Sequence, residues 1–166
     1  IFKDIESRIR SMALIHEKLY QSKDYTHIEL GQYIRDLAMS LYNTYQADLN
    51  RIELETSIEV EHFDIDTAIP CGLMLNELIS NSIKHAFPDN RKGTILVSMT
   101  NLDEGIIELS VKDNGIGIPL NTSREKEESL GMLLIETLVK QLKGSMSIES
   151  NNGTQFIIQF PDPGST

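Results

Sequence analysis

The chain has 166 residues, of which 40% are hydrophobic and 24% charged. These values are typical of one soluble globular domain, and the longest apolar run, GMLLI, is too short to cross a bilayer. The net charge of -10 argues against non-specific binding to nucleic acid. Cys71 is the single cysteine, which excludes an internal disulfide and a cysteine-cluster metal site, so we expect it to be a small core residue.

The first segment, residues 1–21, reads as a helix whose apolar positions follow the alternating spacing of a coiled coil or a two-helix hairpin. These seam positions are Ile5, Ile9, Met12, His16 and Leu19. No capping residue opens the segment, so we expect the chain to begin inside a longer helical element.

Residues 27–30 are predicted to be extended, and residues 31–46 to form a second helix. Residues 51–60 alternate and indicate a strand. Pro70 suits the first turn of the helix that follows. The expected buried stripe of the second helix is Ile34, Leu37, Ala38, Leu41 and Tyr45.

Two strands, residues 94–100 and 106–112, are predicted to form a hairpin after a turn at residues 88–90. A polar stretch at residues 121–129 is either a linker or a mobile lid. A third helix, residues 130–142, should end with Gly144 at its C′ position, and residues 145–150 and 155–160 should form a closing hairpin. Its expected inward residues are Leu130, Leu133, Leu134, Leu138 and Leu142. The order indicates an α+β fold, a two-layer sandwich of one mostly antiparallel sheet with helices on one face.

The stretch LNELISNSIKHAF, residues 75–87, is amphipathic at helical period. Its polar face carries Glu77, Asn81, Lys84 and His85. An ordinary solvated face is one interpretation. The alternative is a ligand site, because asparagine and serine are mediocre helix formers, and a carboxylate, an amide oxygen and a cation in line suit water, hydrated Mg²⁺ and phosphate.

The segment DNGIGIP, residues 113–119, directly follows a predicted strand. It is either a tight turn or a site in which the Asp113 carboxylate accepts from an exocyclic amine while Gly115 and Gly117 let a flat ring approach. SLGM, residues 129–132, is either a helix capped by Ser129 or a phosphate site at a helix N-terminus. Residues 152–154, NGT, are consistent with a simple hairpin turn.

The order NExxxNxxKHAF, DNGIGIP, polar stretch, SLGM and NGT resembles the ATP-binding domain of sensor histidine kinases, in the superfamily shared with gyrase, the heat-shock chaperone and the mismatch-repair ATPases. The resemblance covers residues 28–160. RIRSMALIHEKLYQS extends it to the second helix of a dimerisation and phosphoacceptor hairpin in a short-lid subclass.

This resemblance implies an enzyme that uses ATP and Mg²⁺, with Asn81 holding Mg²⁺ and Glu77 orienting or deprotonating the attacking group. Lys84 would neutralise phosphate charge and His85 would flank the nucleotide. Asp113 would accept from the adenine amine. It also assigns nucleotide contacts to Gly115, Gly117, Ile118, Leu130, Gly131, Met132 and Thr154.

Three departures from the family stand out. The polar stretch lacks the phenylalanine motif of many relatives, Gly131 stands alone where many have two glycines, and the absence of tryptophan argues against the subclass named for a histidine and a Trp-Glu pair, although His85 would fit it. His27 and His62 are expected at the surface. His16, at a seam position, is expected to be a packed or hydrogen-bonded imidazole rather than the phosphoacceptor.

The resemblance implies transfer of the γ-phosphoryl group to a histidine upstream of this chain, for relay to a response-regulator aspartate. It further implies a homodimer in the intact protein, an upstream phosphoacceptor helix as partner, no nucleic acid, and a cytoplasmic location. The expected domains are residues 1–24 (hairpin), 25–162 (ATP-binding) and 163–166 (tail). Two rivals remain: a serine kinase of the anti-sigma type, and a degenerate module that binds nucleotide or a response regulator without turnover.

Overall fold

The computed structural model describes residues 28–45, 51–60, 62–63, 65–118 and 130–165, together with residues 9, 12, 13, 16 and 17. The described N-terminal positions are helical and exposed, with Ile9 61% and Met12 50% accessible. They agree with the predicted first helix, whereas Ile5 and Leu19 lie outside the described residues. So do His27, Ser129 and the polar stretch at residues 121–129.

The core of the fold is a five-stranded sheet with the strand order β2-β4-β5-β7-β6. Its strands are β2 (Ile52–Ile58), β4 (Gly93–Leu102), β5 (Ile106–Asp113), β6 (Ser145–Glu149) and β7 (Thr154–Pro161). Only the β2–β4 pair is parallel, so the sheet is mostly antiparallel, as predicted. The short strands β1 (Ile28–Glu29) and β3 (His62–Phe63) pair separately, which the sequence did not indicate.

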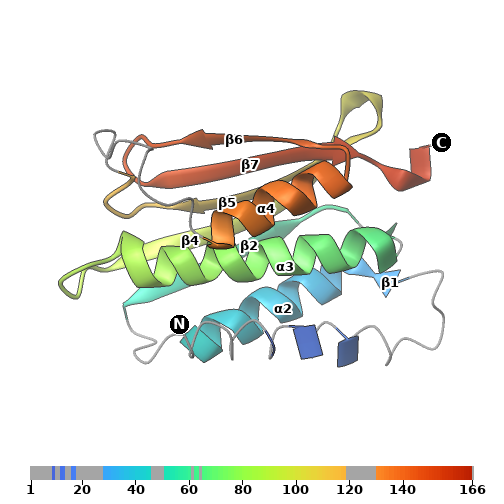
Figure 1. Ribbon diagram of the computed structural model, residues 1–166. Coiled ribbons are helices and arrows are strands. Elements are labelled where there is room, and N and C mark those ends of the chain that lie inside the picture. The colour runs from blue at the N-terminus through green and yellow to red at the C-terminus, as the bar shows by residue number, and fades with distance from the viewer. Residues whose placement is uncertain are drawn as a thin grey trace.

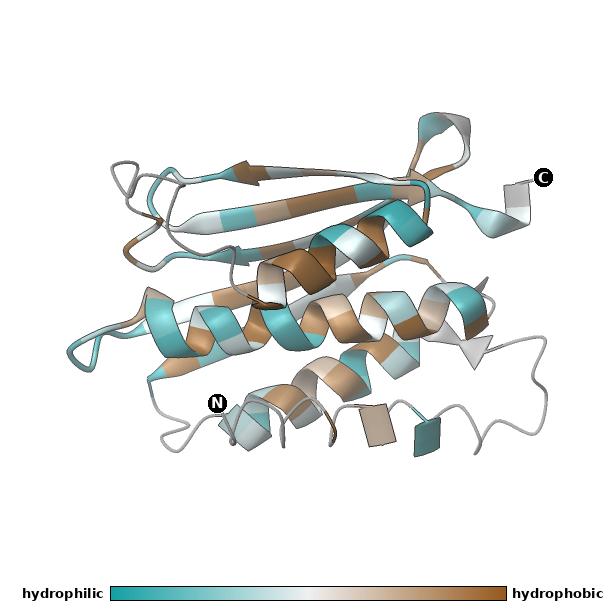
Figure 2. Ribbon diagram, viewed as in Figure 1, coloured by the Kyte–Doolittle hydropathy of each residue, from teal (hydrophilic) through white to brown (hydrophobic). Residues whose placement is uncertain are grey.

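Three helices cover one face of the sheet and complete the two-layer α+β fold (Figure 1). They are α2 (Leu30–Tyr45), α3 (Ile65–Asn81) and α4 (Leu130–Gln141). The central helix, α3, packs against both α2 and α4. Figure 2 shows that the loop after α3 is hydrophilic, whereas hydrophobic residues fill much of the helices and of β7. No helix in the described part of the chain has the length and hydropathy needed to cross a membrane.

The predicted stripe of α2 is confirmed, since Ile34, Leu37 and Ala38 are fully buried. Cys71 is also fully buried in α3, as expected of a core residue. Because burial disfavours the thiolate, the pKa of the Cys71 thiol is raised and the group stays protonated.

The predicted start of α3 is wrong, because the helix begins at Ile65 and Pro70 is its sixth residue. A proline there removes one hydrogen bond, to the carbonyl of Asp66. The first two turns of α3 bury Thr67, Ala68 and Cys71, and this packing offsets the lost bond.

The far end of the same helix also differs from the prediction of one α-helix through Phe87. The α-helical part ends at Asn81, and η1 (Ser82–Ala86) is a π-helical turn. Turns of this kind occur frequently at functional sites.

The predicted leucine stripe of α4 is confirmed only in part, because Leu138 is buried as expected whereas Leu130 and Leu133 are not. Leu130 is 66% exposed and Leu133 48% exposed, and Leu134 and Leu142 are only partly buried. The buried residues are Gly131, Ile135, Leu138 and Val139, which recur at i, i+4, i+7 and i+8.

Gly144 is not the C′ residue of α4, because Lys143 takes the left-handed conformation there, with φ 54°. The N–H of Gly144 donates to the carbonyl of Val139 at 2.9 Å, which closes the helix end. A Cβ on Gly144 would lie 2.4 Å from the carbonyl oxygen of Gln159, so glycine is needed at this position for close packing.

The burial of α4 predicts unequal costs for two substitutions on the same helix. Ile135→Ala should lower the free energy of unfolding by about 2–5 kcal/mol, because it opens a cavity in the core. Leu133→Ala, the matched control, should change it by less than about 0.5 kcal/mol. Urea unfolding of both variants measures the difference, and a greater loss at Leu133 would contradict the described packing.

Candidate functional site

The Asp113 carboxylate is the most highly connected polar group of the predicted site. Asp113 is the last residue of β5 and is 4% exposed. Its Oδ1 accepts from the backbone N–H of Gly115 at 2.9 Å and of Thr154 at 3.2 Å. Its Oδ2 accepts from the Ser82 hydroxyl at 3.2 Å. Since a carboxylate has about four acceptor positions, these three bonds leave room for one further donor.

Close packing of the 113–118 segment against η1 explains one of the predicted glycines. The N–H of Ile116 donates to the carbonyl oxygen of Ala86 at 2.9 Å, and a Cβ on Gly115 would lie 2.3 Å from that oxygen. The contact with Ala86 therefore requires glycine at residue 115, independently of its predicted role in admitting a ligand ring.

Gly117 and Ile118 lie against the turn that connects β6 to β7. Gly117 has φ +75°, a conformation that favours glycine. The Ser150 hydroxyl accepts from the N–H of Ile118 at 3.0 Å and lies 3.2 Å from its carbonyl oxygen. In the same turn, a Cβ on Gly153 would lie 1.9 Å from the carbonyl oxygen of Asp113. The DNG and NGT segments, far apart in sequence, therefore meet through glycine contacts.

A second polar cluster lies on α3, facing α2. Asn76 is 1% exposed and Glu77 4% exposed, so Glu77 is not on a solvated face. The Asn76 amide donates to Oε1 of Glu77 at 3.2 Å, and the Tyr45 hydroxyl donates to Oδ1 of Asn76 at 3.3 Å. The ammonium of Lys84 lies 5.1 Å from the centroid of the Tyr45 ring.

Of the other predicted residues, Thr154 is buried beside Asp113, with which it pairs across β5 and β7. Asn81 is half-buried where α3 gives way to η1, while Lys84 and His85 are exposed on η1. Gly131 is buried in the first turn of α4, Met132 is partly buried and Leu130 exposed.

Sequence reasoning gave no role to Ser82, Ser150 or Tyr45 in this site. Ser82 and Tyr45 lie next to or within predicted helical patterns, but their partners are 31 residues away in each case. Pairings over such a distance leave no periodic signal in one sequence. The Arg91 guanidinium donates to the carbonyl of Asn114 at 3.0 Å and so supports the Asp113 segment.

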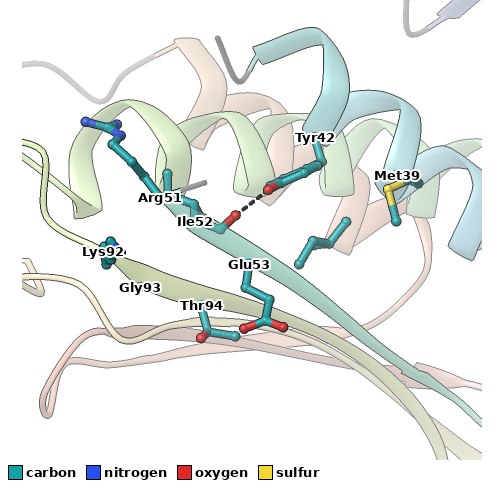
Figure 3. Close-up of a pocket in the computed structure, with 9 residues that line it drawn as sticks. Met39, Tyr42, Arg51, Ile52, Glu53, Lys92, Gly93 and Thr94 are labelled. Atoms are coloured by element: carbon teal, nitrogen blue, oxygen red, sulfur yellow. Dashed lines mark hydrogen bonds between the residues drawn. The ribbon is translucent and has the colours of Figure 1, made fainter. Parts of the chain in front are cut away.

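A separate groove lies between α2 and the starts of β2 and β4 (Figure 3). It contains none of the residues predicted to bind nucleotide. Its lining includes the cations Arg51 and Lys92 and the anion Glu53. The hydroxyl of Tyr42 donates to the carbonyl of Ile52. Its lining residues are Met39, Tyr42, Arg51, Ile52, Glu53, Leu54, Lys92, Gly93 and Thr94.

The family described as histidine kinase-, DNA gyrase B- and HSP90-like ATPase matches residues 67–164, and a family described as histidine kinase matches residues 1–45. Since the first match covers more than half of the chain, the chain belongs to this ATPase family. Its members bind ATP.

The chain is similar to named histidine kinases and, over a shorter stretch, to an anti-sigma factor. Sensor histidine kinase PdtaS of Mycobacterium tuberculosis is 28% identical over 93% of this chain, which spans 31% of that relative. Blue-light-activated histidine kinase 2 of Erythrobacter litoralis is 24% identical over 98% of this chain and 47% of its own length. The anti-sigma F factor of Priestia megaterium is 29% identical over 46% of this chain and 56% of its own length.

The fold is also that of solved kinase domains. The histidine kinase domain of the Erythrobacter litoralis EL346 blue-light activated histidine kinase superposes with a TM-score of 0.81 over 95% of this chain and 74% of its own, at 21% identity. The mycobacterial sensor histidine kinase MprB superposes with a TM-score of 0.61 over 83% of this chain and 97% of its own, at 18% identity. The predicted fold class and family are thus confirmed.

Proposed function

We propose that the chain is the ATP-binding catalytic part of a sensor histidine kinase, which transfers the γ-phosphoryl group of ATP to a histidine for relay to a response-regulator aspartate. The observation that carries the proposal is the Asp113 carboxylate, held by three donors with one acceptor position left, in a chain of an ATP-binding family. The match of residues 1–45 to a histidine kinase family supports histidine as the acceptor.

The match of residues 1–45 to a histidine kinase family also weighs against the rival serine kinase of the anti-sigma type. The anti-sigma F factor aligns with only 46% of this chain, whereas PdtaS aligns with 93%. Against the degenerate module, Glu77, Asn81, Asp113 and Gly117 are all present.

At the adenine end, the free acceptor position of Asp113 would take the exocyclic amine of the base. Thr154 supports the carboxylate through its backbone N–H, at 3.2 Å from Oδ1. Gly117 and Ile118 are fixed by Ser150 and would line the same pocket. Leu130, Gly131 and Met132 lie in the first turn of α4, where the positive end of the helix dipole would favour phosphate.

The polar side chains near Asn81 suit Mg²⁺ better than a metal ion whose ligands are all protein side chains. In the described ranges, no three His, Cys, Asp or Glu side chains gather as a ligand cluster. Mg²⁺ keeps several waters and is held by few protein groups together with substrate phosphates, which suits a single amide oxygen. Asn81 would be that ligand, and the ion would neutralise phosphate charge.

Phosphoryl transfer would then use the residues near η1. A nitrogen of the acceptor imidazole attacks the γ-phosphorus, and the bond from that phosphorus to the β,γ-bridging oxygen breaks to release ADP. Glu77 orients the imidazole and takes its proton, while Lys84 neutralises charge on the phosphates and His85 flanks the nucleotide. Positioning supplies most of the rate in such a reaction.

The organisation of the whole protein is part of the proposal. Residues 1–24 would belong to the dimerisation hairpin, 25–162 to the ATP-binding domain and 163–166 to a tail. The pairing of β1 with β3 is consistent with a domain that begins before Ile28. Exposed Ile9 and Met12 on helical backbone are consistent with a homodimer seam and an upstream acceptor helix.

The adenine contact predicts a selective loss on Asp113→Asn. The two backbone N–H groups would keep the new amide oxygen, so the NH₂ group would face the adenine amine, donor against donor. We expect ATP affinity to fall by about 1–3 kcal/mol with the fold intact, measured by calorimetry. The wild type should bind GTP poorly, because guanine presents a carbonyl there. Equal affinity for ATP and GTP would contradict the assignment.

The metal assignment predicts that Asn81→Ala removes the Mg²⁺-dependent part of ATP affinity and leaves the circular dichroism spectrum unchanged. Asn81 is only half-buried, so the protein should still fold. Calorimetric titrations with ATP, with and without Mg²⁺, measure the difference. An Asn81→Ala variant that binds MgATP normally, or that unfolds, would overturn the role of Asn81 as a metal ligand.

A further inference from the structure

Tyr45, the last residue of α2, contacts two parts of the proposed catalytic helix at once. Its hydroxyl donates to Oδ1 of Asn76 at 3.3 Å, and its ring centroid lies 5.1 Å from the ammonium of Lys84. The ring is partly buried, so it is held between the core and the surface. One side chain outside the recognised motifs therefore reaches both the buried start and the exposed end of the polar face of α3 and η1.

The hydrogen bonds run in one direction, from Tyr45 to the Glu77 carboxylate. Because a phenol donates to Oδ1 of Asn76, the NH₂ group of that amide is turned to its other side, where it donates to Oε1 of Glu77 at 3.2 Å. Asn76 is 1% exposed, so water does not compete for these bonds. Bonds aligned in this way strengthen one another and fix the orientation of the final acceptor.

The ring has a separate effect on Lys84. A lysine on an exposed turn has many rotamers, and an aromatic face within about 6 Å of the ammonium favours those that keep the charge near it. The Lys84 ammonium is thereby held on the side of η1 that faces α2.

We propose that Tyr45 is a positioning residue for phosphoryl transfer, which orients Glu77 through Asn76 and holds Lys84 through its ring. This inference rests on the proposed roles of Glu77 and Lys84. It assigns the two effects to different parts of one side chain, the hydroxyl to Glu77 and the ring to Lys84.

Two other tyrosines of α2 supply matched controls. The hydroxyl of Tyr42 donates to the backbone carbonyl of Ile52 in β2, away from the proposed catalytic residues. The hydroxyl of Tyr33 is buried and has no hydrogen-bond partner among the described residues. Removing either hydroxyl tests stability without touching the Tyr45 network.

The experiment measures kcat and KM for ATP in label transfer to a separately supplied helical hairpin that carries an acceptor histidine. Tyr45→Phe should lower kcat about tenfold with KM within about twofold, because the ring stays while the bond to Asn76 is lost. Tyr45→Leu should in addition raise KM about threefold to tenfold, since Lys84 loses its aromatic partner. Tyr42→Phe should lower the unfolding midpoint and leave kcat and KM unchanged.

Tyr45→Phe with wild-type kcat, or with the same kinetic change as Tyr42→Phe, would overturn this inference and leave the proposed function standing. A wild-type chain that fails to bind MgATP in calorimetry, or to transfer label, would overturn the proposed function and this inference with it.

Discussion

A buried carboxylate that must be satisfied by donors from three segments determines the architecture of the site. Burying a carboxylate costs several kcal/mol, on the order of a whole domain's stability, unless hydrogen bonds compensate it. Asp113 obtains its donors from Gly115 in the following loop, from Thr154 at the start of β7 and from Ser82 on η1. The end of the sheet, the loop and the central helix are thus held to one another by a single group that also has an acceptor position to offer a ligand.

The π-helical turn η1 is best understood from the same contacts. Ser82 and Ala86, its first and last residues, both face the Asp113 segment: one through a hydroxyl, the other through a carbonyl that accepts from Ile116. The helix propensities of these residues do not explain a π-helical turn. The tertiary hydrogen bonds of Ser82 and Ala86 explain it, and the turn leaves Lys84 and His85 on its exposed side.

Periodic segments could be predicted from the sequence and non-local contacts could not. The stripe of α2 and the alternating strands were found because one face of each is buried. The inward face of α4 was misassigned in part, because Leu130 and Leu133 are exposed while Ile135 and Val139 are buried, and both stripes fit helical period. Pro70 and Lys143 depart from local preference because packing and a helix-end hydrogen bond compensate. Motif order assigned Asp113, Gly117 and Glu77 to the proposed site, but not Ser82, Ser150 or Tyr45, whose partners lie at least 31 residues away.

The most direct test of where the nucleotide binds is an NMR titration of the isotope-labelled chain with MgATP. We expect the largest amide shift changes at Ser82, Asp113 and Thr154, with little change at Met39, Glu53 and Leu54 in the groove beside α2. Shift changes confined to that groove would contradict this expectation.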